Sequence, residues 1–312
     1  MQDTKLIRRN GLIKDIRRNK FSYLIILPAL IYTFIFSYCS YPYILIAFQK
    51  YNYEKGIFGS EWVGLKNFEF FFLSRKAPEV TWNTIYLNFL FIITGTMLAV
   101  VIAIMLNELK CRIFVKNTQS IMLFPNYLSW VVVSYMLYSF FSTEHGIINK
   151  VIEAFGGNRV NWYIQPNVWP AILVLMRIWK GAGINAVIFL AAITGIDEFI
   201  FQAASIDGAN RWQQIWHITI PLIMPTVTIM TLLAIGKIMY GDFGMIYALI
   251  GDNGVLYPTT DIIDTYVFRA LRKIGDPSHA MAISLFQSAV GFLMVYGSNW
   301  VTRKFFSEGA LY

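Results

Sequence analysis

Charged residues are scarce in this chain of 312 residues, since Asp, Glu, Lys and Arg together make up 14% of it, whereas soluble domains carry roughly 25%. Hydrophobic residues make up 56%, more than a soluble core of this size needs. The balance excludes an ordinary soluble domain and indicates lipid as the solvent for most of the chain. The net charge of +8 does not indicate nucleic-acid binding, because basic residues gather before residue 21 and are not interleaved over a folded surface.

Residues and motifs that carry catalytic or metal chemistry are also few. The two cysteines, Cys39 and Cys111, have no partner spacing, so neither a disulfide framework nor a metal site is predicted. No Gly-x-x-x-x-Gly-Lys-Ser/Thr loop occurs, and ATP hydrolysis is therefore not expected of this chain. No nucleophile–base or paired-carboxylate arrangement can be identified. We predict a chain that is not an enzyme and that has no catalytic residues, no metal and no cofactor of its own.

Long apolar stretches dominate what is present. A helix needs about 20 mainly apolar residues to cross the hydrocarbon core, and backbone groups surrounded by lipid must be paired internally. The sequence therefore predicts an all-α, polytopic membrane protein with one transmembrane domain over residues 21–302. The six expected helices cover residues 21–48, 84–107, 119–142, 168–193, 218–241 and 281–302.

Basic residues set the predicted orientation. They are dense in the N-terminal segment 1–20, in the connection 108–118 and in the tail 303–312. Short loops rich in Lys and Arg stay on the cytoplasmic side, so both termini are predicted to be cytoplasmic, in agreement with an even number of helices. The apolar run 21–48 is too long for the core of a signal peptide, and we expect it to be retained as the first helix.

The predicted cytoplasmic connection 194–217 is unusually apolar for a segment that faces water. Asp197 suits the N-cap of a short helix, and Gly208 suits a break before a second one. An exposed apolar helix flanked by polar residues indicates docking to a partner protein. The alternative is a helix that lies on the lipid surface, although that role calls for more cations than Arg211 and His217.

Residues 202–225 resemble the EAA loop of permeases in type I binding-protein-dependent ABC importers. The family pattern is Glu-Ala-Ala, three residues, Gly, and then a stretch that ends in Ile-x-Leu-Pro. This chain has Gln202-Ala203-Ala204, Gly208 and Ile218-Thr219-Ile220-Pro221. Replacement of the usual Glu by Gln202 removes a charge from the loop. The resemblance implies that the ATPase contact comprises Gln202, Ala203, Ala204, Asp207, Gly208, Arg211, Trp212 and Trp216.

Three further stretches resemble the carbohydrate-uptake branch of these permeases. Residues 56–68 are similar to the outer loop of sugar permeases, and residues 124–133 and 179–183 to the third and fourth helices of importers for complex oligo- and polysaccharide fragments. The resemblance implies an alternating-access permease subunit in the bacterial cytoplasmic (inner) membrane. It also implies a second homologous permease, an extracellular solute-binding protein and two ATPase subunits that hold ATP and Mg²⁺.

Arg177 and Lys180 lie roughly 14 and 18 Å into the predicted fourth helix, too deep for easy snorkelling. They share one face, which Asn185 continues. This face either lines the substrate path or stabilises contacts by bonding carbonyl groups or a carboxylate on the partner permease. In the first case the two cations favour an anionic saccharide, such as a uronate-containing or sulfated one. Lys237, near the outer end of the fifth helix, is expected to snorkel to the interface.

Aromatic side chains form a further group of candidates for the substrate path. Sugars stack their C–H faces on aromatic rings, and Tyr127, Trp130 and Tyr135 in the predicted third helix are the rings we select. Most other aromatics are expected in interfacial belts and helix packing.

Two other functions stay open at this point. One is an ABC permease for peptides or amino acids. The other is a stand-alone secondary transporter, although that class usually has inverted repeats, which are not found here.

Overall fold

Helices dominate the residues that the computed structural model describes, 11–109 and 111–305. Two short strands, β1 (Gln49–Lys50) and β2 (Glu61–Trp62), form an antiparallel pair with Gln49 opposite Trp62. The all-α prediction is confirmed. The α-helices are α1 (Gly11–Arg18), α2 (Lys20–Thr33), α3 (Gly56–Gly59), α4 (Lys66–Leu73), α5 (Lys76–Glu108), α6 (Arg112–Leu123), α7 (Trp130–Phe141), α8 (Ile147–Ala154), α9 (Trp169–Thr194), α10 (Glu198–Ile206), α11 (Arg211–Gln214), α12 (Ile220–Ile235), α13 (Phe243–Ile250), α14 (Tyr257–Thr260), α15 (Ile263–Arg269) and α16 (Pro277–Phe305).

Short 3₁₀ and π segments extend or join these helices. The 3₁₀ segments are η2 (Tyr41–Phe48), η3 (Phe124–Tyr127), η4 (Trp162–Ile164) and η5 (Pro166–Val168), and the π segments are η1 (Phe34–Tyr38), η6 (Ile215–Thr219) and η7 (Ala270–Ile274).

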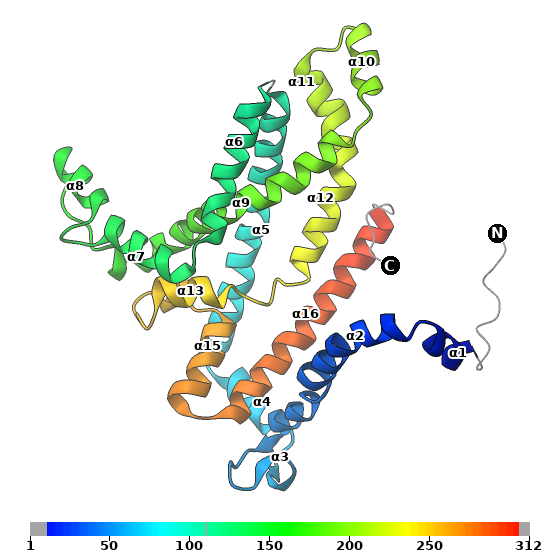
Figure 1. Ribbon diagram of the computed structural model, residues 1–312. Coiled ribbons are helices and arrows are strands. Elements are labelled where there is room, and N and C mark those ends of the chain that lie inside the picture. Colours follow the sequence, from blue (N-terminus) through cyan, green and yellow to red (C-terminus); the bar gives the residue numbers. More distant parts are fainter. Residues whose placement is uncertain (1–10, 110, 306–312) are drawn as a thin grey trace.

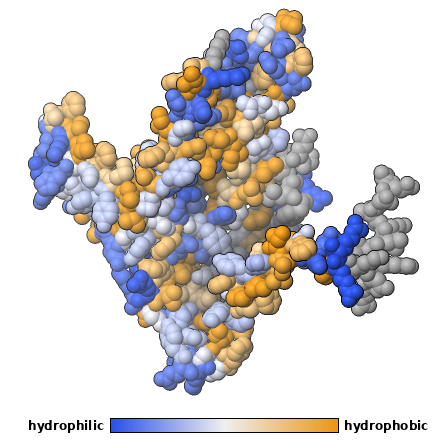
Figure 2. Space-filling view, in the orientation of Figure 1, coloured by the Kyte–Doolittle hydropathy of each residue, from blue (hydrophilic) through white to orange (hydrophobic). Residues whose placement is uncertain are grey.

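The long helices run between two ends of the molecule. Figure 1 shows α10, α11 and the start of α6 at one end and α3, α4 and α15 at the other. Hydrophobic side chains cover much of the surface between the two ends, and hydrophilic side chains gather toward the ends themselves (Figure 2). Within the described residues, five helical stretches are long and apolar enough to cross a membrane, and a bent pair makes a sixth if it counts as one span. The five are Lys20–Phe48, Lys76–Glu108, Pro166–Thr194, Arg211–Ile235 and Pro277–Lys304.

The third predicted helix, over residues 119–142, is not a single straight helix. The chain bends by 98° between α6–η3 and α7. Pro125 lies in the 3₁₀ turn η3, and the Ser129 hydroxyl then caps a new helix by accepting the N–H of Val132 at 3.3 Å. The prediction of one continuous helix was wrong here, because an apolar run indicates that a segment lies in lipid but does not indicate whether its helix bends.

The fifth predicted helix, over residues 218–241, ends earlier than expected. α12 stops at Ile235, and residues 236–242 are irregular. At its other end the helix begins at Arg211, since α11, η6 and α12 are continuous. The predicted C-terminal tail 303–312 starts inside α16, and residues 306–312 lie outside the described residues, as do residues 1–10 of the predicted basic segment.

Small residues allow the central helices to approach closely. Ala99 and Ala103 of α5 and Ala186 of α9 are completely buried in one cluster. A side chain at Gly183 of α9 would meet the Met122 carbonyl oxygen of α6, because an ideal Cβ would lie 2.2 Å from it. Packing of small residues is the usual basis of helix association in lipid, where apolar burial contributes little between helices. The close packing fixes α9, whose polar residues are described below.

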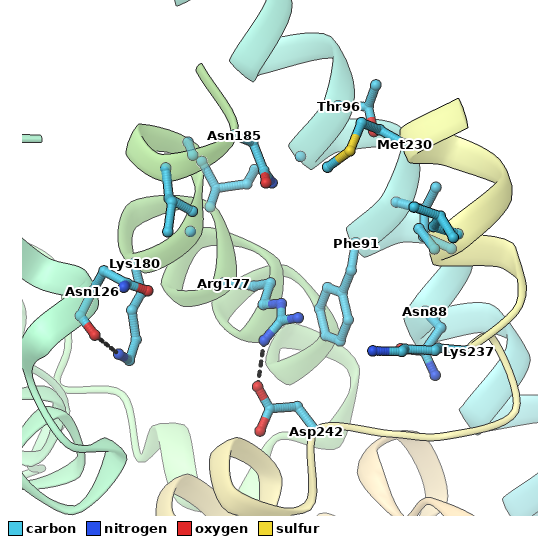
Figure 3. A pocket seen from close by; sticks show the side chains of 18 of the residues that line it. Asn88, Phe91, Thr96, Asn126, Arg177, Lys180, Asn185, Met230, Lys237 and Asp242 are labelled. Atoms are coloured by element: carbon cyan, nitrogen blue, oxygen red, sulfur yellow. Dashed lines mark hydrogen bonds and ion pairs between the residues drawn. The ribbon is translucent and has the colours of Figure 1, made fainter. Parts of the chain in front are cut away.

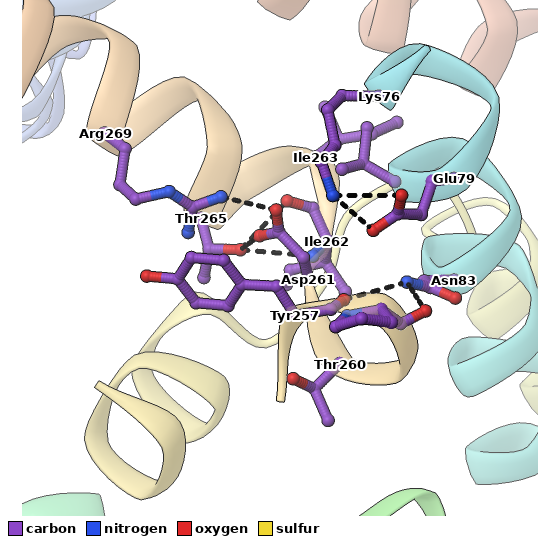
Figure 4. Close-up of polar contacts among 12 residues, drawn as sticks. Lys76, Glu79, Asn83, Tyr257, Thr260, Asp261, Ile262, Ile263, Thr265 and Arg269 are labelled. Carbon is purple, nitrogen blue, oxygen red and sulfur yellow. Dashed lines mark hydrogen bonds and ion pairs between the residues drawn. The ribbon is translucent and has the colours of Figure 1, made fainter. Parts of the chain in front are cut away.

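A buried ion pair stabilises the connection around α14 and α15. Arg269 donates to Asp261, and their side chains are only 16% and 2% exposed. Thr265 donates to the other Asp261 oxygen at 2.7 Å, and the Arg269 guanidinium lies 4.2 Å from the centre of the Tyr257 ring. Asn83 of α5 donates to nearby backbone carbonyls and ties α14 to α5 (Figure 4).

We expect Asp261→Asn to lower the free energy of unfolding by about 3 kcal/mol, since it leaves the buried Arg269 cation without a counter-charge. The midpoint of thermal unfolding in detergent measures this. Asp252→Asn is the matched control, because its ion pair with Lys273, at 3.0 Å, is about half exposed and such pairs contribute little. Equal midpoints for the two variants would contradict the structural role of Asp261.

Candidate functional site

A cavity of about 730 Å³ lies between α5, α9 and the chain that links α12 to α13. Figure 3 shows side chains from these elements pointing toward one another across it. Its volume falls within the range of roughly 300–1,000 Å³ that is common for ligand sites. Its wall combines amide side chains with the rings of Phe91, Trp130, Tyr240 and Phe243, a mixture suited to a sugar, which needs both hydrogen bonds and apolar stacking.

The charged residues that line this cavity are mainly basic. They are Arg177, Lys180, Lys237 and Asp242, so the cations exceed the carboxylates by two. Within the described residues, the ammonium group of Lys237 has no hydrogen-bond or ion-pair partner. A cavity with an excess of cations attracts anionic ligands, because concave walls that carry charges of one sign concentrate their field.

Arg177 of α9 forms an ion pair with Asp242, which lies just before α13. The pairing contradicts neither of the two roles considered for Arg177, because the residue both lines the cavity and bonds a carboxylate. That carboxylate belongs to this same chain. The side chains of Arg177 and Asp242 are 46% and 22% exposed, so the pair is accessible from the cavity (Figure 3).

Lys180 of α9 bonds backbone carbonyl groups. Its ammonium group donates to the carbonyl oxygen of Asn126 at 2.8 Å and to that of Pro125 at 3.4 Å. It also lies 5.2 Å from the centre of the Trp130 ring, within the range of a cation–π contact. The stronger of these contacts satisfies the Asn126 carbonyl, which is freed at the bend between α6 and α7 (Figure 3); the Pro125 carbonyl also accepts the Leu128 N–H at 3.2 Å.

Side chains from other helices hold the irregular residues 236–242. Asn88 of α5 donates to the carbonyl oxygens of Ile238 at 2.9 Å and Tyr240 at 3.3 Å. Gln287 of α16 donates to the Met239 carbonyl at 2.6 Å. Non-helical backbone at membrane depth is tolerated where protein groups satisfy it or where it lines a cavity, and here both conditions are met.

Asp264 of α15 accepts a backbone N–H of this irregular segment. Its carboxylate accepts the amide of Gly241 at 2.7 Å and the Gln287 side chain at 3.1 Å. Burial raises the pKa of the Asp264 carboxyl, and these two hydrogen bonds oppose the rise. A side chain on Gly241 would also meet Ile262, since an ideal Cβ would lie 2.2 Å from its Cδ1. The segment is therefore fixed on the side of α15 and α16.

The structure brings some of the predicted substrate-path residues together and leaves others apart. Trp130 and Asn185 line the cavity with Arg177 and Lys180. Tyr127 and Tyr135 do not line it and are 80% and 72% exposed. These two rings were selected with Trp130 as members of one predicted third helix, and the chain bends by 98° between Tyr127 and Trp130.

Sequence reasoning missed Lys237 and Asp242 as cavity residues. Lys237 was expected to snorkel from the end of a helix, but it follows that helix on the irregular segment and lines the cavity. Asp242 directly follows the predicted fifth helix, 65 residues away from Arg177 in sequence, and was not selected as a candidate. The available signal was the sequence Gly236-Lys237 and Gly241-Asp242, because paired Gly and ionisable residues late in an apolar run indicate a broken helix.

The predicted ATPase-coupling loop folds as two short helices. Asp197 caps α10 by accepting the Phe199 N–H at 3.0 Å, and Gly208 adopts a φ of +83° in the turn that follows. Gln214 of α11 is buried and donates to Ser205 of α10 at 2.9 Å, which joins the two helices.

Within the described chain no group of three or more His, Cys, Asp or Glu could hold a metal ion.

This loop exposes a large apolar surface. Ile206 is 87% exposed. Phe199 and Ile200 are exposed as well. Among the predicted contact residues, Ala204 is partly buried. The exposed ones are Gln202, Ala203, Asp207, Gly208, Arg211, Trp212 and Trp216. Exposed apolar side chains at the polar end of a membrane protein indicate a protein partner.

Residues 11–305 match the model of the family described as "Binding-protein-dependent transport system inner membrane component". The chain belongs to this family. Membership makes it an integral membrane component of an ABC transporter, with the type I permease fold.

Relatives of this permease include a protein named for the transport of polygalacturonan and rhamnogalacturonan. The polygalacturonan/rhamnogalacturonan transport system permease protein YteP of Bacillus subtilis (strain 168) is 35% identical over 97% of this chain and 94% of its own length. Protein LplB of the same organism is 32% identical over 94% of this chain and 92% of its own length.

A solved structure has the same fold. In the crystal structure of a bacterial ABC transporter involved in the import of the acidic polysaccharide alginate, one chain matches this permease with a TM-score of 0.86 and 30% identity, covering 95% of this chain and 99% of that one. A second structure shows a bacterial alginate ABC transporter in complex with an alginate pentasaccharide-bound periplasmic protein, with a TM-score of 0.84 and 30% identity over 93% of this chain and 96% of that one.

We expect Lys180→Met to lower the midpoint of thermal unfolding of the purified transporter by about 2–4 °C, because it removes charge-assisted hydrogen bonds to two carbonyls. Lys237→Met removes the same charge from the same cavity but no hydrogen bond, and its midpoint should stay unchanged. Equal shifts in the two variants would show that Lys180 does not stabilise the bend.

Proposed function

We propose that this chain is a permease subunit of an ATP-driven importer for acidic oligosaccharides, the fragments of uronate-containing polysaccharides. The observation that carries the proposal is the cavity in the membrane domain, whose lining has two more cations than carboxylates. Polygalacturonan and alginate, which appear in the names of a relative and of a similar structure, are both polymers with carboxylate groups. A neutral sugar would leave the excess cations without a counter-charge, whereas an acidic sugar supplies one.

The same proposal assigns partners to the chain. A second homologous permease would complete the substrate path, and an extracellular solute-binding protein would deliver the oligosaccharide. Two ATPase subunits would bind ATP and Mg²⁺. We place the assembly in the bacterial cytoplasmic membrane, with both termini and the loop 194–217 on the cytoplasmic side. The support is the clustering of basic residues at segments 1–20 and 108–118 and the family description.

In the proposed mechanism the loop α10–α11 transmits movement of the ATPases to the membrane helices. The loop suits this role because α11, η6 and α12 are continuous over Arg211–Ile235. A displacement of the loop would therefore move α12 and, beyond it, the irregular residues that line the cavity. Alternation between inward- and outward-facing states then follows from two arrangements of these packed elements.

Gly208→Trp and Gly208→Ala test the contact with the ATPase. Both variants share the backbone strain of a left-handed residue, and an added Cβ meets no atom within 4 Å in this chain. We expect Gly208→Ala to retain most of the stimulated ATPase activity. In Gly208→Trp this activity should fall at least about tenfold, because only the large ring prevents close approach of a partner. The measurement is ATPase activity stimulated by the loaded binding protein in proteoliposomes. Equal activity of the two variants would refute this contact.

Uptake of two matched sugars tests the substrate class. The probes are a galacturonic acid trimer and the same trimer with its carboxyl groups reduced to alcohols, offered to the complete reconstituted transporter. We expect uptake of the acidic trimer only. Lys237→Gln should lower its uptake about fivefold, since one charge interaction in a hydrated path contributes about 1 kcal/mol. Lys237→Arg serves as the control that keeps the charge. Preference of the wild type for the reduced trimer would refute the proposed function.

A further inference from the structure

The chain contains two Arg–Asp ion pairs whose environments differ. Arg269–Asp261 is buried and has additional partners in Thr265 and Tyr257. Arg177–Asp242 is partly exposed and lines the cavity. An ion pair open to water is weak because both charges stay hydrated when it separates. Only the second pair is therefore suited to exchange its partner for a soluble anion.

Asp242 can release Arg177 without loss of its structural role. One carboxylate oxygen contacts Arg177, whereas the other accepts the Met245 N–H at 3.0 Å and so caps α13. Met245 itself is completely buried, in the same cluster as Val133 and Leu137 of α7. α13 is thus held by its cap and its packing, independently of the ion pair.

The ion pair is also the hydrogen-bonded link between α9 and residues 236–242 within the described residues. The other side-chain hydrogen bonds of this segment to long-range partners lead to Asn88 of α5, to Asp264 of α15, and to Gln287 and Ser288 of α16. Separation of Arg177 from Asp242 would leave the segment attached on those sides and without a hydrogen bond to α9. The cavity lies between these two sides (Figure 3).

We propose that the Asp242 carboxylate occupies Arg177 in place of a substrate carboxylate, and that an acidic sugar entering the cavity displaces it. The inference rests on the proposed function, because it assigns the specificity of that same cavity. The guanidinium group accepts either carboxylate with the same geometry. Asp242 is tethered close by, so it competes at a high effective concentration. A neutral sugar cannot displace it, and the exchange therefore selects acidic sugars and frees residues 236–242 from α9 only when one is bound.

The experiment compares three variants of the complete transporter in proteoliposomes with the galacturonic acid trimer and its carboxyl-reduced form. In Asp242→Asn the competing charge is lost, whereas an amide oxygen can still cap α13. We expect its KM for the acidic trimer to fall about threefold to fivefold, the range that corresponds to loss of an exposed ion pair. Arg177→Gln should raise this KM by a similar factor, and neither variant should improve uptake of the reduced trimer.

The double variant Arg177→Gln/Asp242→Asn separates competition from a general electrostatic effect. If Asp242 acts through Arg177, the double variant has the KM of Arg177→Gln, because the second change has nothing left to release. A carboxylate that merely repels the substrate would lower KM in both backgrounds. Asp252→Asn, which breaks an exposed ion pair outside the cavity lining, is the control and should leave KM unchanged. Asp242→Glu keeps the carboxylate and should have the wild-type KM. Asp242→Ser, whose hydroxyl can also cap a helix, replaces Asp242→Asn if that variant fails to assemble.

The outcomes distinguish this inference from the proposed function. Wild-type uptake of the acidic trimer, combined with an unchanged or higher KM in Asp242→Asn, would overturn the exchange at Arg177 and leave the proposed function intact. An additive double variant would overturn it as well. A wild-type transporter that imports only the reduced trimer would overturn both.

Discussion

The requirement that every backbone polar group be paired in lipid governs this structure. Regular helices meet it by themselves, and at two departures from regular helix within the described residues other groups bond the freed backbone. Lys180 satisfies carbonyls at the bend after α6, and Asn88 and Gln287 satisfy those of the irregular segment 236–242. Both departures lie beside the cavity. The polar side chains that make the broken backbone tolerable are thus also the ones that give the cavity its chemistry.

The two Arg–Asp pairs illustrate how burial decides the role of one pair of functional groups. The pair at Arg269 is shielded and has extra partners, so its separation would leave a charge in a medium that solvates it poorly. The pair at Arg177 is open to the cavity, where water and ligands reach both groups. The first therefore contributes to the stability of the scaffold, and the second is available for recognition. Residue type alone does not distinguish them.

Much of the fold could be predicted from the sequence, because the features concerned are local. Apolar runs of about 20 residues identify membrane helices, and the helical character of the six stretches is confirmed. The caps at Asp197 and the turn at Gly208 were also predictable, since each depends on a few neighbouring residues. The candidate site was predicted in part. Arg177, Lys180, Asn185 and Trp130 line the cavity, and depth within a helix was the signal that selected the first two.

The sequence by itself determined that the chain is an all-helical membrane protein with an apolar loop suited to a partner, because hydropathy and capping act over one or two helical turns. Only the tertiary structure decided that the third helix bends by 98°, that Tyr127 and Tyr135 lie outside the cavity lining, and that Lys237 and Asp242 belong to it. It also decided that the partner of Arg177 is Asp242. The physical reason is that these contacts join residues far apart in the chain, and packing among several helices, not local propensity, brings them together.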